Sequence, residues 1–331
     1  MLDGGVRLSV LESTAAQPGA LAYDAIQQSI MVAKAAESAG CHRIWVTEHH
    51  AEPTIASSAP AVLVAHLAAH TTGIRVGSGG VMLVNHAPLV VAEQFATLEA
   101  AHPGRIDLGI GSAAGAPGNP PVFRQALGSL DRPASAHPQR VDELIGFVRG
   151  DFPAGHPYRD VVVSPRVHPV PIFLLGSSMR GGLLAAERGL PFAFAHHLGA
   201  AQPGPVLTRY RSEFRATAPA AEPYVIVSVA VLCADSDAEA EHLAGAVVAD
   251  HRRRTEAGPG GPDRAPGSLL VGGPRTVAEG LAGLAAATGA DEMMMVPIDR
   301  DGPGRIRTIR LAAAGWPRSG DGGRRSGVRV A

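Results

Sequence analysis

Histidines gather where the predicted β-strands of this chain end. Five of the fourteen histidines directly follow such strands, namely His49, His50, His86, His196 and His197. Glu48 immediately precedes the first of them, so a carboxylate joins the imidazoles. Imidazoles and carboxylates transfer protons near neutral pH and also ligate metal ions. The clustering therefore predicts one polar site that is assembled from several strand ends.

Two kinds of site could use these side chains. Adjacent residues of a strand point in opposite directions, so His49 and His50 cannot easily bind one ion together, and neither can His196 and His197. One histidine from each pair would form a two-histidine, one-carboxylate metal set with Glu48. The alternatives are buried, hydrogen-bonded rings or a polar ring around an organic cofactor. We expect no metal here, and both of these alternatives stay open on the residues alone.

A run of small residues, Gly176-Ser177-Ser178, lies between a predicted strand and a predicted helix. Small residues let the backbone approach an anion, hydroxyls donate hydrogen bonds, and the helix N-terminus adds its dipole. Arg180 would lie in the first helical turn, where a cation is misplaced for the dipole and is better matched to a bound anion. The segment therefore indicates a phosphate site, with a simple serine N-cap as the alternative.

The elements that must position these residues alternate between strand and helix. Predicted strands cover 7–11, 43–47, 74–83, 105–110, 171–175, 191–195, 224–234 and 292–297. Predicted helices cover 23–39, 60–71, 88–101, 139–149, 180–188, 206–217, 237–254, 276–288 and 306–314.

Eight strand–helix units in one chain predict an α/β fold, a (β/α)8 TIM barrel with an irregular insertion over 112–169 after the fourth strand. An open doubly wound sheet is the alternative. We expect a single domain over 1–318 and a flexible C-terminal tail over 319–331. Active sites of such barrels lie at the carboxyl ends of the strands, where the histidines and the small-residue run fall.

Composition excludes several other classes of protein. The 331 residues carry a formal net charge of −1, which argues against a nucleic-acid partner. The two cysteines, Cys41 and Cys233, are too few for a disulfide scaffold or a cysteine-rich zinc site. We find no signal peptide and no apolar run near the 20 residues that span a membrane. We therefore expect a cytoplasmic protein with no membrane partner and a small-molecule substrate.

At these same residues the chain resembles the luciferase-like flavin-dependent monooxygenases, the bacterial luciferase superfamily. The matching segments are 35–50, 74–83, 103–111, 173–178 and 185–197. They occur through most of the chain in the family's order. The branch that matches best contains oxidoreductases with one type of subunit, several of which modify natural products.

The resemblance implies a barrel that binds reduced FMN (FMNH2) supplied by a separate flavin reductase. O2 would react with the flavin to give a C4a-peroxyflavin that oxygenates a small organic substrate. Some relatives use the deazaflavin F420 instead, so an F420-dependent dehydrogenase on the same fold is the alternative. The resemblance also implies a homodimer.

The resemblance assigns roles to particular residues. His49 matches the catalytic acid/base, with Glu48 beside it. Gly79-Gly80 matches the place where many members have a non-prolyl cis peptide bond under the flavin ring. Ser177 and Ser178 match the phosphate-binding segment. The proposed cofactor-binding set is completed by Ser112, Gly176, Arg180, His196 and His197.

One position departs from the family pattern. Members usually carry an arginine just after the fourth strand that pairs with the FMN phosphate, and Ser112 stands there in this chain. Loss of a charge-assisted pair should weaken FMN binding unless Arg180 replaces it. The segment before Val271 is also short, which predicts a reduced lid over the site. Both features leave open a non-catalytic flavin-binding homologue.

Overall fold

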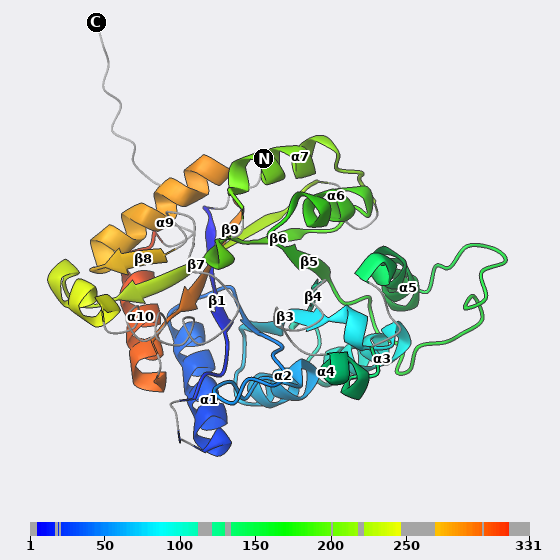
Figure 1. Ribbon diagram of the computed structural model, residues 1–331, viewed down its shortest axis with the longest axis horizontal. Coiled ribbons are helices and arrows are strands. Elements are labelled where there is room, and N and C mark those ends of the chain that lie inside the picture. Colours follow the sequence, from blue (N-terminus) through cyan, green and yellow to red (C-terminus); the bar gives the residue numbers. More distant parts are fainter. Residues whose placement is uncertain are drawn as a thin grey trace, which may run out of the picture.

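Eight parallel strands close into a barrel that is surrounded by helices (Figure 1). The computed structural model describes residues 5–16, 19, 21–111, 121–129, 134–199, 201–217, 222–245, 269–299 and 301–317. The barrel strands are β1 (Arg7–Glu12), β2 (Arg43–Val46), β3 (Arg75–Met82), β4 (Ile106–Gly111), β5 (Ile172–Gly176), β6 (Phe192–Ala195), β7 (Val225–Cys233) and β9 (Glu292–Pro297). Each pairs in parallel with the next, and β9 returns to β1. The predicted (β/α)8 barrel is confirmed.

A ninth strand, β8 (Leu269–Gly272), was not predicted. It pairs in parallel with Ala230–Cys233, the second half of β7. β6 pairs with the first half of β7, Val225–Ser228, along the same edge. Its four residues are too few to show a strand periodicity in the sequence. It extends one edge of β7 without entering the barrel ring.

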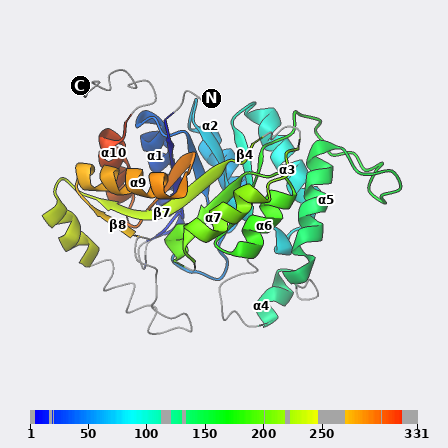
Figure 2. The ribbon, with the colours of Figure 1, turned by 90° about the horizontal axis from the view of Figure 1, so that it is seen from above.

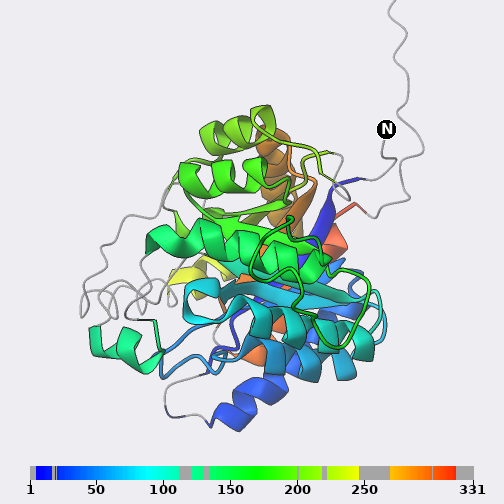
Figure 3. The same cartoon turned by 90° about the vertical axis from the view of Figure 1, so that its right-hand side faces the viewer.

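Helices cover the outside of the barrel, as the views from above and from the side show (Figures 2 and 3). They are α1 (Ala22–Ser38), α2 (Pro60–Ala69), α3 (Pro88–Ala101), α6 (Met179–Glu187), α7 (Pro203–Ser212), α9 (Pro274–Thr288) and α10 (Gly302–Gly315). A further helix is described over residues 237–245. No helix in the described ranges is long and apolar enough to cross a bilayer.

The connection from β4 to β5 is the irregular insertion that the sequence predicts. It contains α4 (Pro121–Ala126), a short 3-10 turn η2 (Ala134–Ala136) and α5 (His137–Arg149). The structure starts α5 two residues before the predicted helix, with a proline in its first turn, and adds α4, which was not predicted. Ser112 and the expected tail over 319–331 lie outside the described residues.

Alternate residues of β2 point to opposite sides of the sheet. Ile44 and Val46 pack against the helices, whereas Trp45 points into the barrel and is fully buried. The Trp45 ring meets Phe173 edge-on, with 5.0 Å between centroids. A Cβ on Gly77 would come within 2.8 Å of the Trp45 indole nitrogen, so a glycine there makes room for the indole. The barrel interior is thus a packed core rather than a pore.

Buried ion pairs close the amino end of the barrel below Trp45. Arg43 contacts Asp107 at 2.7 Å (Nη1–Oδ2) and Glu292 at 2.9 Å (Nε–Oε1). Arg75 contacts the other oxygen of Asp107 at 2.6 Å. The side chains of Arg43, Asp107 and Glu292 are almost wholly buried, so their charges depend on one another for compensation.

Candidate active site at the barrel mouth

The ends of β2 and β3 lie next to each other at the carboxyl edge of the barrel. Val46, the last residue of β2, pairs with Ser78 of β3. Therefore the polar residues after β2 leave the sheet beside Gly79-Gly80. The peptide bond between Gly79 and Gly80 is cis, as the family resemblance implies.

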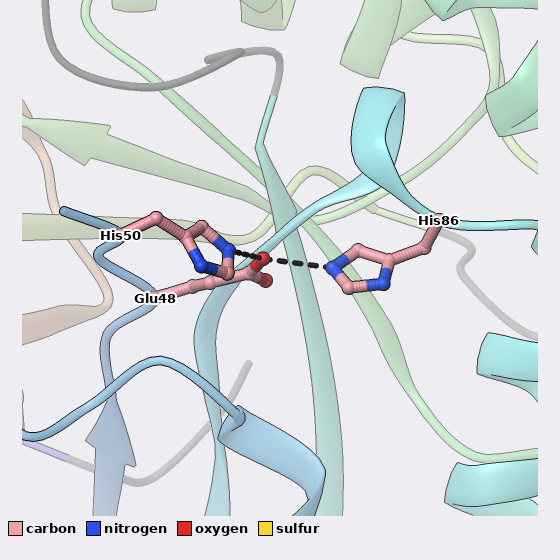
Figure 4. A group of neighbouring side chains, drawn as sticks. All are labelled: Glu48, His50 and His86. Carbon is pink, nitrogen blue, oxygen red and sulfur yellow. Dashed lines mark hydrogen bonds and ion pairs between the residues drawn. The ribbon is translucent and has the colours of Figure 1, made fainter. Parts of the chain in front are cut away.

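Glu48 is the centre of a hydrogen-bonded group of three side chains (Figure 4). Its Oε1 accepts hydrogen bonds from His50 Nε2 and from His86 Nε2, each at 2.7 Å. Its Oε2 accepts from the backbone N–H of Met82 at 2.9 Å. Because a carboxylate can only accept, both rings carry a proton on Nε2. Glu48 thus fixes two imidazoles and the end of β3 at once.

The ionisation of Glu48 follows from these contacts. Burial of the side chain would raise its pKa, but the hydrogen bonds from His86, His50 and the Met82 N–H outweigh burial and hold the pKa below its ordinary value. Glu48 is therefore a carboxylate at neutral pH. Sequence reasoning noted that His86 follows the third strand but did not place it in the proposed site set.

His49 is held apart from that group. Its Nδ1 lies 2.9 Å from Thr47 Oγ1, and its backbone N–H donates to the Ser57 carbonyl at 2.7 Å. Burial lowers the pKa of His49, although the nearby carboxylates of Glu52 and Glu48 act in the opposite direction. The ring is consequently neutral at pH 7 and can accept a proton.

The two consecutive histidine pairs do not lie within strands, contrary to the reasoning applied to them. β2 ends at Val46, before His49 and His50, and His196 begins a 3-10 turn, η3 (His196–Leu198). The members of the first pair still have different partners, because the chain turns between them. The two-histidine set that forms around Glu48 contains His50 and His86, with no member from the second pair.

His197 has a defined tautomer. The Ser228 hydroxyl donates its proton to the Phe194 carbonyl at 3.2 Å, and His197 Nδ1 lies 2.7 Å from the same hydroxyl oxygen. A hydroxyl has one proton, so Nδ1–H of His197 is the donor to the Ser228 oxygen. His196 is 3% exposed beside it.

The turn after β5 forms a helix cap. Ser178 precedes α6, and its Oγ accepts from the Gly181 N–H at 3.2 Å. The N-cap interpretation is therefore correct for Ser178. Ser177 is half-buried just before the cap, and Arg180 is exposed in the first turn. The amino end of α6 faces the same edge of the barrel as the histidines.

Replacing Ser178 by Ala should lower the free energy of unfolding by about 0.5–2 kcal/mol, because the Gly181 N–H loses its acceptor. Urea denaturation followed by circular dichroism measures the change. Ser212→Ala is the matched control, since that exposed hydroxyl lies at the end of α7, and its effect should stay within about 0.5 kcal/mol. Equal losses in the two variants would contradict the assigned cap.

Gly80 needs to be glycine because of the neighbouring strand. A Cβ at this position would lie 2.9 Å from the backbone of Gly109 in β4. A Cβ on Gly79 would lie 2.5 Å from Leu11 Cδ1. Barrel packing therefore accounts for both glycines, and their predicted contact with a flavin remains a proposal.

A cavity of about 650 Å³ lies at the opposite end of the barrel. Arg7, His42, Thr72 and Trp316 are among its lining residues. These residues belong to the amino ends of the strands and to the end of α10. The cavity is thus separate from the site that Glu48 and the histidines form.

Comparisons with known proteins agree with this arrangement. The model of the luciferase-like monooxygenase family matches residues 6–292. A luciferase-like monooxygenase of Escherichia coli K12 is 36% identical over 340 residues, which cover 94% of this chain and 97% of that protein. An N-acetyl-S-alkylcysteine monooxygenase of Bacillus subtilis is 41% identical over 239 residues, which cover 71% of this chain and 70% of that protein.

Solved structures show the same likeness. Apo-MsnO8 has a TM-score of 0.86 and 35% identity, covering 94% of this chain and 98% of its own. The fold alone is shared with an FMN complex of 3,6-diketocamphane monooxygenase from Pseudomonas putida (TM-score 0.68, 20% identity, 93% and 97% covered). It is also shared with an F420-dependent secondary alcohol dehydrogenase (TM-score 0.62, 14% identity, 94% and 98% covered). The chain belongs to the luciferase-like monooxygenase family of oxidoreductases.

Proposed function

We propose that the barrel mouth binds reduced FMN and that the protein uses O2 to oxygenate a small organic substrate. The observation that carries the proposal is a half-buried His49, whose pKa is lowered by burial, next to Glu48 at the carboxyl edge of the barrel in a chain of this family. The FMN complex of a structural neighbour supports the choice of flavin. The relative that acts on N-acetyl-S-alkylcysteine supports a thioether as the first substrate to try.

The residues present fit a phosphorylated flavin. A Cβ added to Gly111 at the end of β4 would meet no atom within 4 Å among the described residues, and one on Gly176 would meet only ordinary contacts at 3.9 Å or more. Ser177, the first N–H groups of α6 and Arg180 lie next to this space and would bind the phosphate. Reduced FMN would supply the electrons that activate O2.

The remaining chemistry belongs to the protein. His49 would accept a proton at the mouth through Nε2, because burial favours its neutral ring and Thr47 holds the ring at Nδ1. Glu48 would keep His50 and His86 in one tautomer, and Ser228 would hold the His197 ring in place. The histidines and Glu48 would position and transfer protons. The packed residues inside the barrel would keep water from reaching the site through the barrel.

Replacing Arg180 by Gln should raise the dissociation constant for reduced FMN about tenfold or more, because a charge-assisted hydrogen bond to phosphate is lost. Anaerobic fluorescence titration measures the affinity. Arg188→Gln is the control, because Arg188 at the other end of α6 bonds Asp142 at 2.7 Å and should leave the affinity unchanged. An unchanged affinity in the Arg180 variant would remove this residue from the phosphate site.

The function itself is tested by single turnover. Protein loaded with reduced FMN without oxygen is mixed with ¹⁸O2 and an N-acetyl-S-alkylcysteine, and the product is analysed by mass spectrometry. Incorporation of one ¹⁸O atom supports the proposal. Tight binding of F420 with none of FMN would favour the F420-dependent dehydrogenase instead. Binding of FMN without oxygenation of any candidate substrate would favour a non-catalytic homologue.

We further propose that a separate reductase supplies the reduced flavin and that two copies of the chain associate. Membership of the family supports both points. Light scattering measures the mass in solution, and a monomer at micromolar concentration would contradict the second point. Turnover with NADH and FMN only after a reductase is added would support the first.

A further inference from the structure

We propose that Glu48, His50 and His86 form a binding site for a divalent transition-metal ion of the Zn²⁺ type. Oε1 of Glu48 and the two Nε2 atoms lie within 4.8 Å of one another at the barrel mouth. The ion would use three side chains that the proposed function assigns to positioning protons, and no metal was expected there from the sequence.

The donor set is the one that such ions prefer. Two imidazoles and one carboxylate form a facial set that leaves coordination positions open. Zn²⁺ lies about 2.0–2.2 Å from such donors, so tetrahedral ligand atoms stand roughly 3.4 Å apart. The two O–N distances of 2.7 Å must therefore lengthen by less than about 1 Å, and the two Nε2 atoms, which lie within 4.8 Å of each other, must reach about 3.4 Å. Side-chain rotation can supply this shift, because the side chains of His50 and His86 are 14% and 32% exposed.

The surroundings already orient the donors. The Met82 N–H occupies Oε2 of Glu48, so that Oε1 is directed at the rings. Nη2 of Arg140 donates to the backbone carbonyl of His86 at 2.7 Å and fixes the segment that carries this ring. Outer contacts of this kind orient metal ligands and contribute to affinity.

The charge of the group also favours a cation. Asp107 and Glu12 are buried carboxylates whose partners are arginines, Arg43 and Arg305 respectively. Glu48 instead contacts two histidines, His50 and His86, and the neutral form of a histidine ligates metal ions. A dication there would compensate the charge of the buried carboxylate.

Metal binding requires a defined proton rearrangement. Each ring must move its proton from Nε2 to Nδ1, so that the Nε2 lone pair binds the ion. No bond to carbon forms or breaks, and moving a proton from one ring nitrogen to the other releases no net proton. His49 stays outside the donor set, because Thr47 already contacts its Nδ1.

Isothermal titration of chelator-treated, flavin-free protein with ZnCl2 tests the site. We expect one ion per chain in the mouth and at least a tenfold weaker affinity in His86→Asn, with the same direction in His50→Asn. Co²⁺ should give a visible absorption band in the parent protein that both variants lose. Circular dichroism tests whether each variant is folded. If one variant fails to fold, the other still tests the site.

The matched control removes the competing surface pair. His66 lies in the last turn of α2 and His70 is the residue that caps its end; their ring centroids are 4.7 Å apart, and the two rings could also bind Zn²⁺. The double variant His66→Asn/His70→Asn should retain the mouth ion and its Co²⁺ band. Loss of all binding in this control, or unchanged binding in His86→Asn and His50→Asn, would overturn the proposal. Because no flavin is present, failure here would leave the proposed oxygenation untouched.

Discussion

Replacing Arg43 by Met should lower the free energy of unfolding by about 3–5 kcal/mol. Arg43 is 3% exposed and bonds both Asp107 and Glu292 inside the barrel. Without it, Glu292 loses its ion-pair partner and Asp107 is left with Arg75. Met fills a similar volume, so the loss reports uncompensated charge rather than a cavity.

Urea denaturation of Arg43→Met followed by tryptophan fluorescence measures this loss. Arg209→Met is the control, since Arg209 forms an exposed pair with Glu213 at 3.1 Å, and such pairs contribute about 1 kcal/mol or less. A loss below about 1 kcal/mol in Arg43→Met would show that the cluster at the amino end of the barrel is not a stabilising unit.

Replacing His49 by Gln should lower kcat for oxygenation by about 10²–10⁴-fold, because Gln cannot accept a proton. FMN affinity should change little, which separates proton transfer from binding. His66→Gln on α2 is the control and should keep the parent rate. Equal kcat values in His49→Gln and the parent would remove His49 from the reaction and favour the non-catalytic interpretation.

The pH profile gives a second test of His49. Its pKa is lowered by burial, so the neutral base is present at pH 7 and is lost only as the pH falls through the lowered value. Therefore kcat/KM should be flat near neutrality and fall on the acid side, with its midpoint below the ordinary histidine value of 6.5. A midpoint above 6.5 would contradict a buried, neutral ring.

Much of the fold could be read from local patterns. The eight barrel strands were each located in the sequence, because parallel strands buried on both faces form apolar runs such as 225–233. The strand β8 was missed, because four residues carry no periodicity. The start of α5 at His137 was also missed, since helix boundaries depend on contacts as well as on the periodic residues.

The sequence predicted most of the residues of the candidate site. It predicted only part of the contacts between their side chains. The sequence indicated Glu48, His49 and the turn at Ser177-Ser178, because all follow strand ends. It paired Glu48 with one histidine from each consecutive pair, whereas the structure brings His86 to it. Nothing in the local sequence could reveal that η1 (Leu83–Asn85) turns the chain so that His86 meets Glu48.

The order of strands and helices, and the placement of polar residues after each strand, were determined by the sequence alone, because periodicity and strand ends are local properties. Tertiary structure decided which polar atoms meet. Closing the barrel sets the register of β2 against β3, and that register brings carboxylate, imidazole and backbone donors within hydrogen-bonding distance. Hydrogen bonds form only when donor and acceptor lie about 3 Å apart. The spacing of residues along the chain does not reveal which side chains come that close across the barrel.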